Sequence, residues 1–489
     1  MSTPMTAQPG VAPPRVELTR WPWLRRILRQ RALNWMLMSV ALIGFLLAVA
    51  AGLLGTAAGS ANFGIVFVWI VWWGLLMGLL LPLGGRLWCL ICPIPAPGEW
   101  LQRKALVAPP VNGEGPALLS IDDAEQPPRR WGLRKGWRWP KSLRGIWLQN
   151  AGFLGVALFS AVILTRPSVT GWVLLGFLAG GMGLAMLFER RSFCRYVCPV
   201  GGFIGLYSLV APVELRVRDP LVCRDHRTKD CYLGNEGGYG CPWLEQPWTL
   251  DRNASCGLCG ECLRTCTKDN VAVNLRWPGS DLLVAHGWKL DEAYKAFIML
   301  ACAAIYPVVF LGPWGWLKAW ANLATLRGFA IYALGFLVLN LVAVPALHLG
   351  MAALTRWVSG WQDIPLRRLF VALAYALVPL GLAAWMAFTV SLVFANLSYA
   401  LPVLSDPFGW GWNLLGTRDV AWRPWLTGWV QPAQAALLIA GLVASIAAAD
   451  AILQKIQHRG AGIQGLAVQT ALLTAETALF LWLYLGAAT

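Results

Sequence analysis

Charged side chains are scarce in this sequence. They make up 13% of its 489 residues, against 57% hydrophobic residues, whereas soluble domains carry about 25% charged residues. The GxGxxG and P-loop patterns are absent, which leaves nucleotide binding without support. Histidine is also rare, with four in the chain, and neither these nor the ten methionines form a cluster. The composition is therefore not typical of a soluble enzyme, a nucleotide-binding protein or a metal-capture protein.

Apolar runs long enough to cross a bilayer recur along the sequence. A spanning helix needs roughly 20 consecutive apolar residues. Nine runs approach or exceed this length, at 34–58, 63–83, 146–165, 170–188, 295–317, 328–351, 369–396, 432–453 and 464–485. We therefore predict an all-α polytopic membrane protein of about nine transmembrane helices.

The net charge of +16 is concentrated in a few connecting segments. With a cytoplasmic N-terminus, all the main basic clusters fall on one side of the membrane, at 15–31, 129–144, 190–195, 356–368 and 455–459. This positive-inside pattern sets topology, so the charge does not indicate nucleic-acid binding. The first run is too long for a cleaved signal peptide, and we interpret it as an anchor. We expect a bacterial inner-membrane protein with an external C-terminus.

Four cysteines in the stretch "CGLCGECLRTC" have the spacing that loads an iron–sulfur cluster in bacterial ferredoxins. Cys256, Cys259 and Cys262 are predicted to hold one [4Fe–4S] cluster. In the ferredoxin pattern the fourth cysteine, here Cys266, ligates a different cluster. The missing fourth ligand of the first cluster should be a distant Cys-Pro, and Cys241 precedes Pro242.

A second cluster would then need Cys266 and three further ligands. The stretch "CRDHRTKDC" supplies Cys223, Cys231 and His226, since imidazole replaces thiolate at some iron–sulfur centres. The alternative is a structural zinc site, because three cysteines and one histidine at such spacing also suit zinc. Its ligands would be Cys223, His226, Cys231 and Cys241.

The first half of the chain contains a duplication. Two apolar helix pairs run into "RLWCLICPIPAPGEW" at 86–100 and "RSFCRYVCPVGGFIG" at 191–205. Stacking of the two units would bring Cys89, Cys92, Cys194 and Cys198 together at the cytoplasmic membrane edge and supply four thiolates for a third cluster. A Cys-Pro pair can also simply end a helix, but two matched pairs favour a ligand role. Cys302, inside a span, is interpreted as a small buried apolar residue.

These features divide the chain into four regions. Residues 1–32 form a basic N-terminal segment, and 33–205 form the duplicated membrane units. Residues 206–292 form a cytoplasmic α+β ferredoxin-like insert, and 293–489 form a five-helix membrane domain. The basic, Trp-rich loop at 102–145 is predicted to rest on anionic lipid headgroups.

The two Cys-Pro units followed by a ferredoxin-type run resemble the membrane-bound polyferredoxin family. This family includes the quinol-oxidising membrane subunit of periplasmic nitrate reduction, the membrane iron–sulfur protein of nitrous oxide reduction and an oxidase-assembly iron–sulfur factor. The resemblance covers about 63–275. The sequence departs from the family pattern at three points: it has Cys-x2-Cys at 89–92 where the family has Cys-x3-Cys, it has a single regular ferredoxin run, and Thr267 follows Cys266 where proline is usual. The resemblance implies [4Fe–4S] clusters, membrane electron transfer and partner redox subunits.

We therefore expect a membrane-bound, quinone-linked electron-transfer protein that exchanges electrons between a soluble cytoplasmic carrier and quinone or a partner complex. The main alternative is a redox assembly factor that reduces a metal or thiol for another membrane enzyme. A transporter with a redox gate is a third hypothesis, but the charged residues Glu476 and Asp450 look isolated. Haem on His348 is the fourth, but a bis-His haem needs a second histidine, and His286 and His458 lie in predicted cytoplasmic segments.

Overall fold

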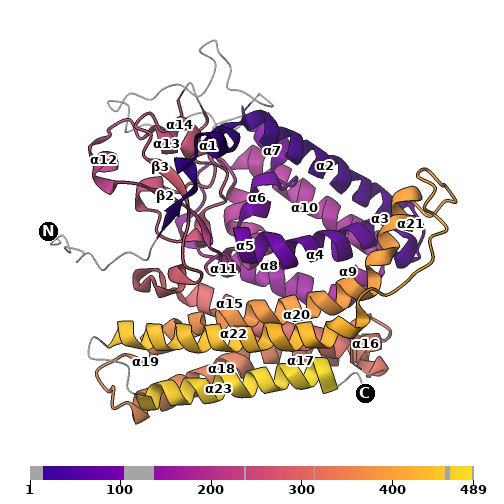
Figure 1. Cartoon of the computed structure of the whole chain (residues 1–489). Helices are drawn as coiled ribbons and strands as arrows, with labels where there is room; N and C mark the ends of the chain where they lie inside the picture. The colour runs from indigo at the N-terminus through magenta and orange to yellow at the C-terminus, as the bar shows by residue number, and fades with distance from the viewer. Residues whose placement is uncertain (1–14, 104–136, 236–237, 313, 458–462, 487–489) are drawn as a thin grey trace.

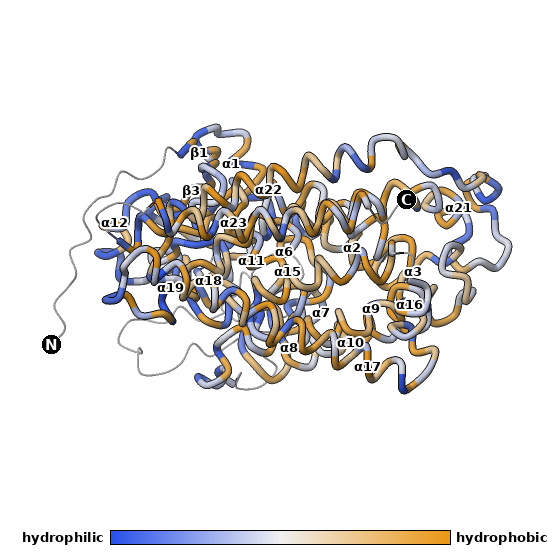
Figure 2. Tube along the Cα trace, turned by 90° about the horizontal axis from the view of Figure 1, so that it is seen from below, coloured by the Kyte–Doolittle hydropathy of each residue, from blue (hydrophilic) through white to orange (hydrophobic). Residues whose placement is uncertain are grey.

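The structure is a computed structural model, and it describes residues 15–103, 137–235, 238–312, 314–457 and 463–486. Long, roughly parallel helices make up most of it, with a polar region packed against one end (Figure 1). Figure 2 shows apolar residues along the helices and polar residues gathered at the two ends. The predicted lipid-contacting loop falls mostly in 104–136, outside the described residues.

Eight helices are long and apolar enough to cross a membrane, counted over the described residues. They are α2 (Arg31–Leu54), the α3–α5 run (Phe63–Gly84), α10 (Pro167–Leu187), α15 (Leu290–Phe310), the α17–α18 run (Leu326–Val358), the α19–α21 run (Leu366–Ser405), α22 (Thr427–Ile456) and the α23–η15 run (Ile463–Gly486). A membrane protein is thus indicated by helix length and composition.

The ninth predicted span, at 146–165, is not one continuous helix. It consists of α8 (Trp147–Leu158) and α9 (Ser160–Thr165), which meet at Phe159. Backbone bonds from Phe159 to Gly155 and from Ile163 to Phe159 carry the i→i−4 ladder across this break. The pair begins beside the polar region, where the Ile146 N–H donates to Asp291, and ends at the other side beside Asn322.

The ends of the spans agree with the predicted relative topology. The polar region, with α12 (Pro220–Asp225), lies at one end, whereas α16 (Gly315–Ala321) and α21 (Ala400–Ser405) lie at the other (Figure 1). Several basic residues lie at the polar end and contact it, among them Arg31 to Glu261 and Lys455 to the Leu283 carbonyl. Of the described residues, Arg31 and Lys455 thus place two of the predicted basic clusters at the polar end.

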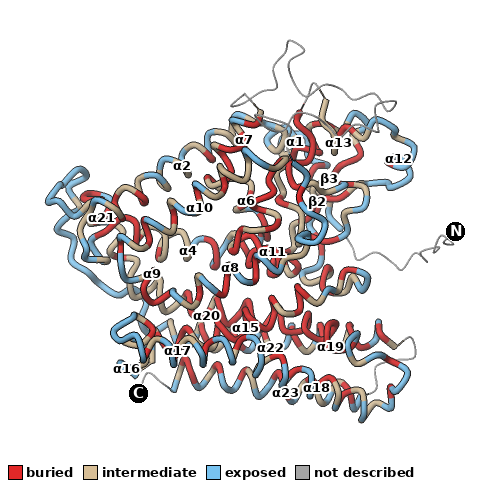
Figure 3. Tube along the Cα trace, turned by 180° about the vertical axis from the view of Figure 1, so that it is seen from behind, coloured by how far each residue is buried: buried red, intermediate tan, exposed pale blue. Residues whose placement is uncertain are grey.

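The core lies where the duplicated units meet the C-terminal helices. Two spans are mostly buried inside the protein. Within an 18-residue apolar stretch of each, 94% of the residues are buried in Leu366–Ser405 and 72% in Leu290–Phe310. Figure 3 shows this buried centre around α15 and α20 (Val378–Asn396). Helix α15 contacts α8 and α11 (Pro199–Tyr207) on one side and α18 (Val344–Val358) and α20 on the other, so it joins the two halves.

The polar region is built on a three-stranded antiparallel sheet in the order β1-β3-β2. Strands β2 (Val213–Val217) and β3 (Val271–Leu275) enclose the insert in sequence, and β1 (Val16–Glu17) is added by the N-terminal segment. Helix α1 (Pro22–Arg29) follows β1, and Arg29 donates to the Leu263 carbonyl. Residues 15–31 thus form part of the insert's surface.

Candidate iron–sulfur site

The four Cys-Pro cysteines lie just beyond the polar ends of two spans. Cys89 is in α6 (Leu87–Ile91) and Cys92 ends that helix. Cys194 is in the π-helical turn η7 (Phe193–Val197), and Cys198 caps α11, where its Sγ accepts the Gly201 N–H at 3.3 Å. Pro93 and Pro199 directly follow the second cysteines, so the helix in each unit ends at that cysteine.

These four cysteines come together, as the duplication predicts. All four line one end of a cavity of about 270 Å³. Burial, and then the neighbouring sulfurs of Cys89 and Cys198, raise the pKa of Cys92. Burial also raises the pKa of Cys198 to about 11, with Cys89 contributing in the same direction. Such thiols stay protonated unless a metal or cluster binds and stabilises the thiolate.

The rest of this cavity is apolar and lies among the spans. Its walls include the rings of Trp72, Trp73, Phe153 and Trp385, and it reaches Leu392. Three of the indole N–H groups that line it are paired: Trp69 with Thr170, Trp73 with Thr389 and Trp385 with the Met299 carbonyl. The Trp72 indole N–H has no acceptor among the described residues.

A buried ion pair ties the two cysteine units together. Arg191 Nε and Nη2 donate to the two oxygens of Glu99 at 2.8 and 2.7 Å, while its Nη1 donates to the Cys89 carbonyl at 2.9 Å. Glu99 comes from α7 (Ala96–Arg103), which follows the first unit. Gln149 adds bonds to the Cys194 and Arg195 carbonyls at 3.1 and 3.0 Å. Both units are therefore held by buried polar contacts.

A second group of four cysteines lies in the insert. Cys241, Cys256, Cys259 and Cys262 all line one small cavity of about 20 Å³. The loop that carries the last three is tight, because Leu258 and Gly260 both adopt positive φ. Burial, and then Cys241 and Glu261, raise the pKa of Cys259 to about 12. Cys241 is thus brought to the ferredoxin run, where the sequence predicted a fourth ligand.

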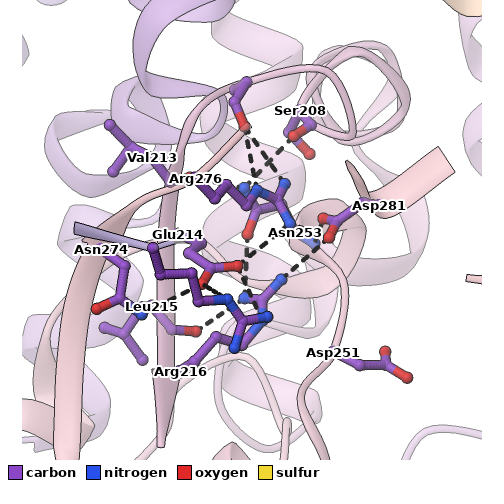
Figure 4. Close-up of polar contacts among 12 residues, drawn as sticks. Ser208, Val213, Glu214, Leu215, Arg216, Asp251, Asn253, Asn274, Arg276 and Asp281 are labelled. Atoms are coloured by element: carbon purple, nitrogen blue, oxygen red, sulfur yellow. Dashed lines mark hydrogen bonds and ion pairs between the residues drawn. The ribbon is translucent and has the colours of Figure 1, made fainter. Parts of the chain in front are cut away.

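A buried charge network fixes the approach to this loop (Figure 4). Arg276 pairs with Glu214 and Asp281, and Arg216 Nη2 lies 3.3 Å from Asp281. Asp281 also accepts the backbone N–H of Asn253 at 2.6 Å. Since Asn253 precedes Cys256 by three residues, the network anchors the start of the cysteine loop to β2 and β3.

Cys223, Cys231 and Cys266 form the third group. Asn270 joins two of them, because its Nδ2 donates to Cys223 Sγ and its backbone N–H donates to Cys266 Sγ, both at 3.2 Å. Burial, and then the charges of Cys266 and Cys223, raise the pKa of Cys231 to about 12. Cys266 therefore lies with the 223–231 stretch, as the predicted second cluster requires.

His226 lies beside this third group. Its Nε2 is 2.9 Å from Thr228 Oγ1, 3.4 Å from Thr267 Oγ1 and 3.5 Å from Asp230 Oδ2. Thr267 and Asp230 adjoin Cys266 and Cys231 in sequence. His226 is thus near enough to the group to stay a candidate ligand, although its ring nitrogen faces oxygen atoms.

A single-ion site is not assembled from these residues. Over the described ranges, no three or more His, Cys, Asp or Glu residues gather around one point that could hold a metal ion. Of the four proposed zinc ligands, Cys241 lines the cavity of the ferredoxin run. Burial raises the pKa of Cys231, and Cys241 lies near enough to that thiol to raise it further. A [4Fe–4S] cluster binds each thiolate to a different iron, so its ligands stand further apart than those of one ion.

The remaining candidate residues have other partners. Cys302 is fully buried and lies 3.3 Å from Asn340 Oδ1, as expected for a packing residue. His286 is exposed and pairs with Asp251, and His458 lies outside the described residues. His348 Nε2 lies 3.0 Å from Glu476 Oε1. The expectation that Glu476 is isolated is therefore wrong, because α23 packs on α18 and brings the two together.

Several buried cations near the cysteines were not predicted as functional residues from the sequence. Arg86 and Arg191 occupy matched positions in the duplicated motif and are 4% and 5% exposed. Lys295, at the start of a span, is fully buried with its Nζ donating to the Gln149 carbonyl at 3.2 Å. The repeated Arg three residues before each first cysteine was the available signal, whereas Lys295 had none.

Comparison with known proteins supports the iron–sulfur assignment. The 4Fe–4S binding domain family matches the chain at residues 65–109 and 170–216. These two segments contain the two Cys-Pro units and their preceding spans, so the duplication is recovered independently. Searches of curated proteins and of solved structures gave no match. The match and the eight long apolar helices together support a membrane iron–sulfur protein suited to electron transfer.

Proposed function

We propose that this chain conducts single electrons between a soluble carrier at the insert and a quinone in the membrane. The observation that carries the proposal is that the four cysteines of the duplicated units line one end of the large apolar cavity. Thiolates at this position would hold a [4Fe–4S] cluster at the boundary between the polar region and the spans. Two further clusters in the insert would complete a row.

The ligand assignment follows the three groups. Cys89, Cys92, Cys194 and Cys198 would bind the membrane-edge cluster. Cys241, Cys256, Cys259 and Cys262 would bind the nearer insert cluster. Cys223, Cys231 and Cys266 would bind the outer one, with His226 as the fourth ligand. When bound, the clusters supply the one-electron chemistry, whereas the chain buries them, separates them and surrounds them with hydrogen-bond donors.

The cavity favours quinone as the membrane partner. An isoprenoid quinone is a largely apolar molecule, and ligand sites of this kind are concave, mostly apolar and carry few polar groups. The ring of Trp88 and the four cysteines line the end of the cavity where a headgroup would approach the cluster. We further propose that the insert faces the cytoplasm of a bacterial inner membrane, because the basic residues lie at that end, and that partner redox subunits dock there.

Cysteine substitution in anaerobically purified protein tests this function. Wild-type protein should contain roughly twelve irons per chain, four for each of three clusters. Cys92→Ser and Cys198→Ser should each remove the same electron paramagnetic resonance signal and abolish quinol-dependent reduction, while a soluble donor still reduces the insert. Cys302→Ser is the control, since Cys302 is also a buried cysteine but donates to Asn340 and does not line the cavity. Full iron content and quinone turnover in the Cys92/Cys198 double variant would refute the proposal.

A further inference from the structure

Two buried side chains, Arg86 and Trp243, lie between the membrane-edge cysteines and the insert. They are 4% and 2% exposed. The Arg86 guanidinium lies over the Trp243 ring, with its Cζ 5.0 Å from the ring centroid. Arg86 Nη2 also donates to the carbonyl of Ala254, two residues before Cys256. The pair therefore links the first Cys-Pro unit to the start of the ferredoxin run.

Trp243 faces both groups of four cysteines. It lines the large cavity that the membrane-edge cysteines line, and it also lines the small cavity of Cys241, Cys256, Cys259 and Cys262. On the insert side its indole packs so closely on Gly257 that a Cβ there would collide with the ring. The indole is thus fixed between the two groups.

Arg86 acts on the membrane-edge group. The Arg86 guanidinium lies near the sulfurs of Cys89 and Cys198. Any negative charge that develops on these sulfurs would therefore be stabilised by Arg86. Gly205 leaves room for the guanidinium, because a Cβ at that position would collide with Arg86.

Three N–H groups of this pair lack acceptors. Arg86 Nε and Nη1 and Trp243 Nε1 are buried and donate to no protein atom in the part of the chain that the structure describes. Buried donors are nearly always paired in folded proteins. Cluster sulfides and cysteine thiolates accept hydrogen bonds of this kind, and such bonds tune cluster potentials. The unpaired donors lie between the two places where clusters would supply those acceptors.

Taken with the proposed function, on which it rests, this arrangement leads to an assignment. We propose that Arg86 and Trp243 form an inter-cluster junction: Arg86 donates to the membrane-edge cluster and Trp243 donates to the nearer insert cluster. Each side chain raises the reduction potential of the cluster that it contacts. Together they keep water out of the space between the two clusters. In the transfer itself one electron leaves one cluster and reduces the other, and no bond forms or breaks.

Redox titration of the full chain in detergent, followed by electron paramagnetic resonance, tests the junction. A positive charge stabilises the more negative reduced state, so Arg86→Gln should lower the midpoint potential of the membrane-edge centre. We expect about a tenfold change in its reduction equilibrium, ~59 mV for a one-electron couple. Trp243→Phe keeps the ring but removes the N–H, and it should lower the potential of the nearer insert centre instead.

Trp139→Phe is the control, because Trp139 is also buried but its indole donates to the Leu143 carbonyl. It should leave every potential unchanged. If Arg86→Gln fails to load iron, Arg86→Lys keeps the charge without the forked donors and should still lower the membrane-edge potential. Wild-type potentials in iron-loaded Arg86 and Trp243 variants would overturn the junction, whereas wild-type protein without clusters would overturn the proposed function.

Discussion

The two Cys-Pro units match in sequence but differ by one residue between their cysteines. In the first unit, Cys89 and Cys92 are joined by an α-helical turn. In the second, Cys194 and Cys198 are joined by a π-helical turn, closed by a bond from the Cys198 N–H to the Phe193 carbonyl at 2.8 Å. A π turn absorbs one extra residue, so both units present their cysteines to the same cavity despite the unequal gaps.

The arginines at matched positions in the two units have different partners. Arg191 is clamped by both oxygens of Glu99. Arg86 stacks on Trp243, and its Nε and Nη1 have no acceptor among the described residues. Of the two arginines in the duplicated motif, Arg191 therefore ties the units together, whereas Arg86 is available to hydrogen-bond a bound cluster. Experiments on each unit separately can test this division of roles.

The largest expected effect comes from breaking the Arg191–Glu99 pair. Both side chains are almost completely buried, and removing one partner of a buried pair costs about 3–5 kcal/mol because the other charge is left unpaired. Glu99→Gln should therefore lower the midpoint of thermal unfolding in detergent and release iron earlier on heating. Arg224→Gln, which breaks an exposed pair with Asp225, is the control and should have little effect.

The same pair predicts a pH dependence. Burial would raise the pKa of Glu99, but the charges of Arg103 and Arg191 outweigh it and hold the pKa below the ordinary value. Its stabilising contribution is therefore complete above the unfolded pKa of about 4.3 and is lost as pH falls through the lower folded pKa. The stability difference between wild type and Glu99→Gln should shrink over that acidic interval; a constant difference would contradict the assignment.

An intermediate effect is expected at Gly201 in the second unit. A Cβ at this position would lie 2.7 Å from the Cys194 carbonyl oxygen, so the turn must shift. The shift would weaken the bond from the Gly201 N–H to Cys198 Sγ. Gly201→Ala should therefore lower the occupancy and the potential of the membrane-edge centre, measured by iron content and redox titration.

Gly155→Ala is the matched control, since no atom lies within 4 Å of a Cβ at that helix position. It should bind as much iron as the wild-type protein and show the same midpoint potentials in redox titration. Equal losses in both variants would mean that the Gly201 effect is a general consequence of adding a methyl group to the bundle.

The sequence predicted the elements of the fold and the grouping of cysteines better than the contacts around them. The length of the apolar runs identified the spans, and the Cys-Pro dipeptide at 241–242 indicated that Cys241 would join the ferredoxin run. The break at Phe159 and the pairing of His348 with Glu476 depend on how helices pack, which no local pattern encodes. The different partners of Arg86 and Arg191 likewise arise from distant residues, Trp243 and Glu99, that the repeat itself does not contain.

The smallest expected effect concerns the backbone donor three residues after the second cysteine, which only one unit has. Gly201 lies three residues after Cys198 and donates its N–H to that sulfur. The matched residue in the first unit, three after Cys92, is Pro95, which has no N–H to donate. Pro95→Ala would supply one. If the units are equivalent in backbone path, the added bond should raise the membrane-edge potential slightly, while Pro365→Ala, at an exposed position before α19 (Leu366–Ala374), should not. A lowered potential in Pro95→Ala would show that the first unit approaches the cluster by a different path.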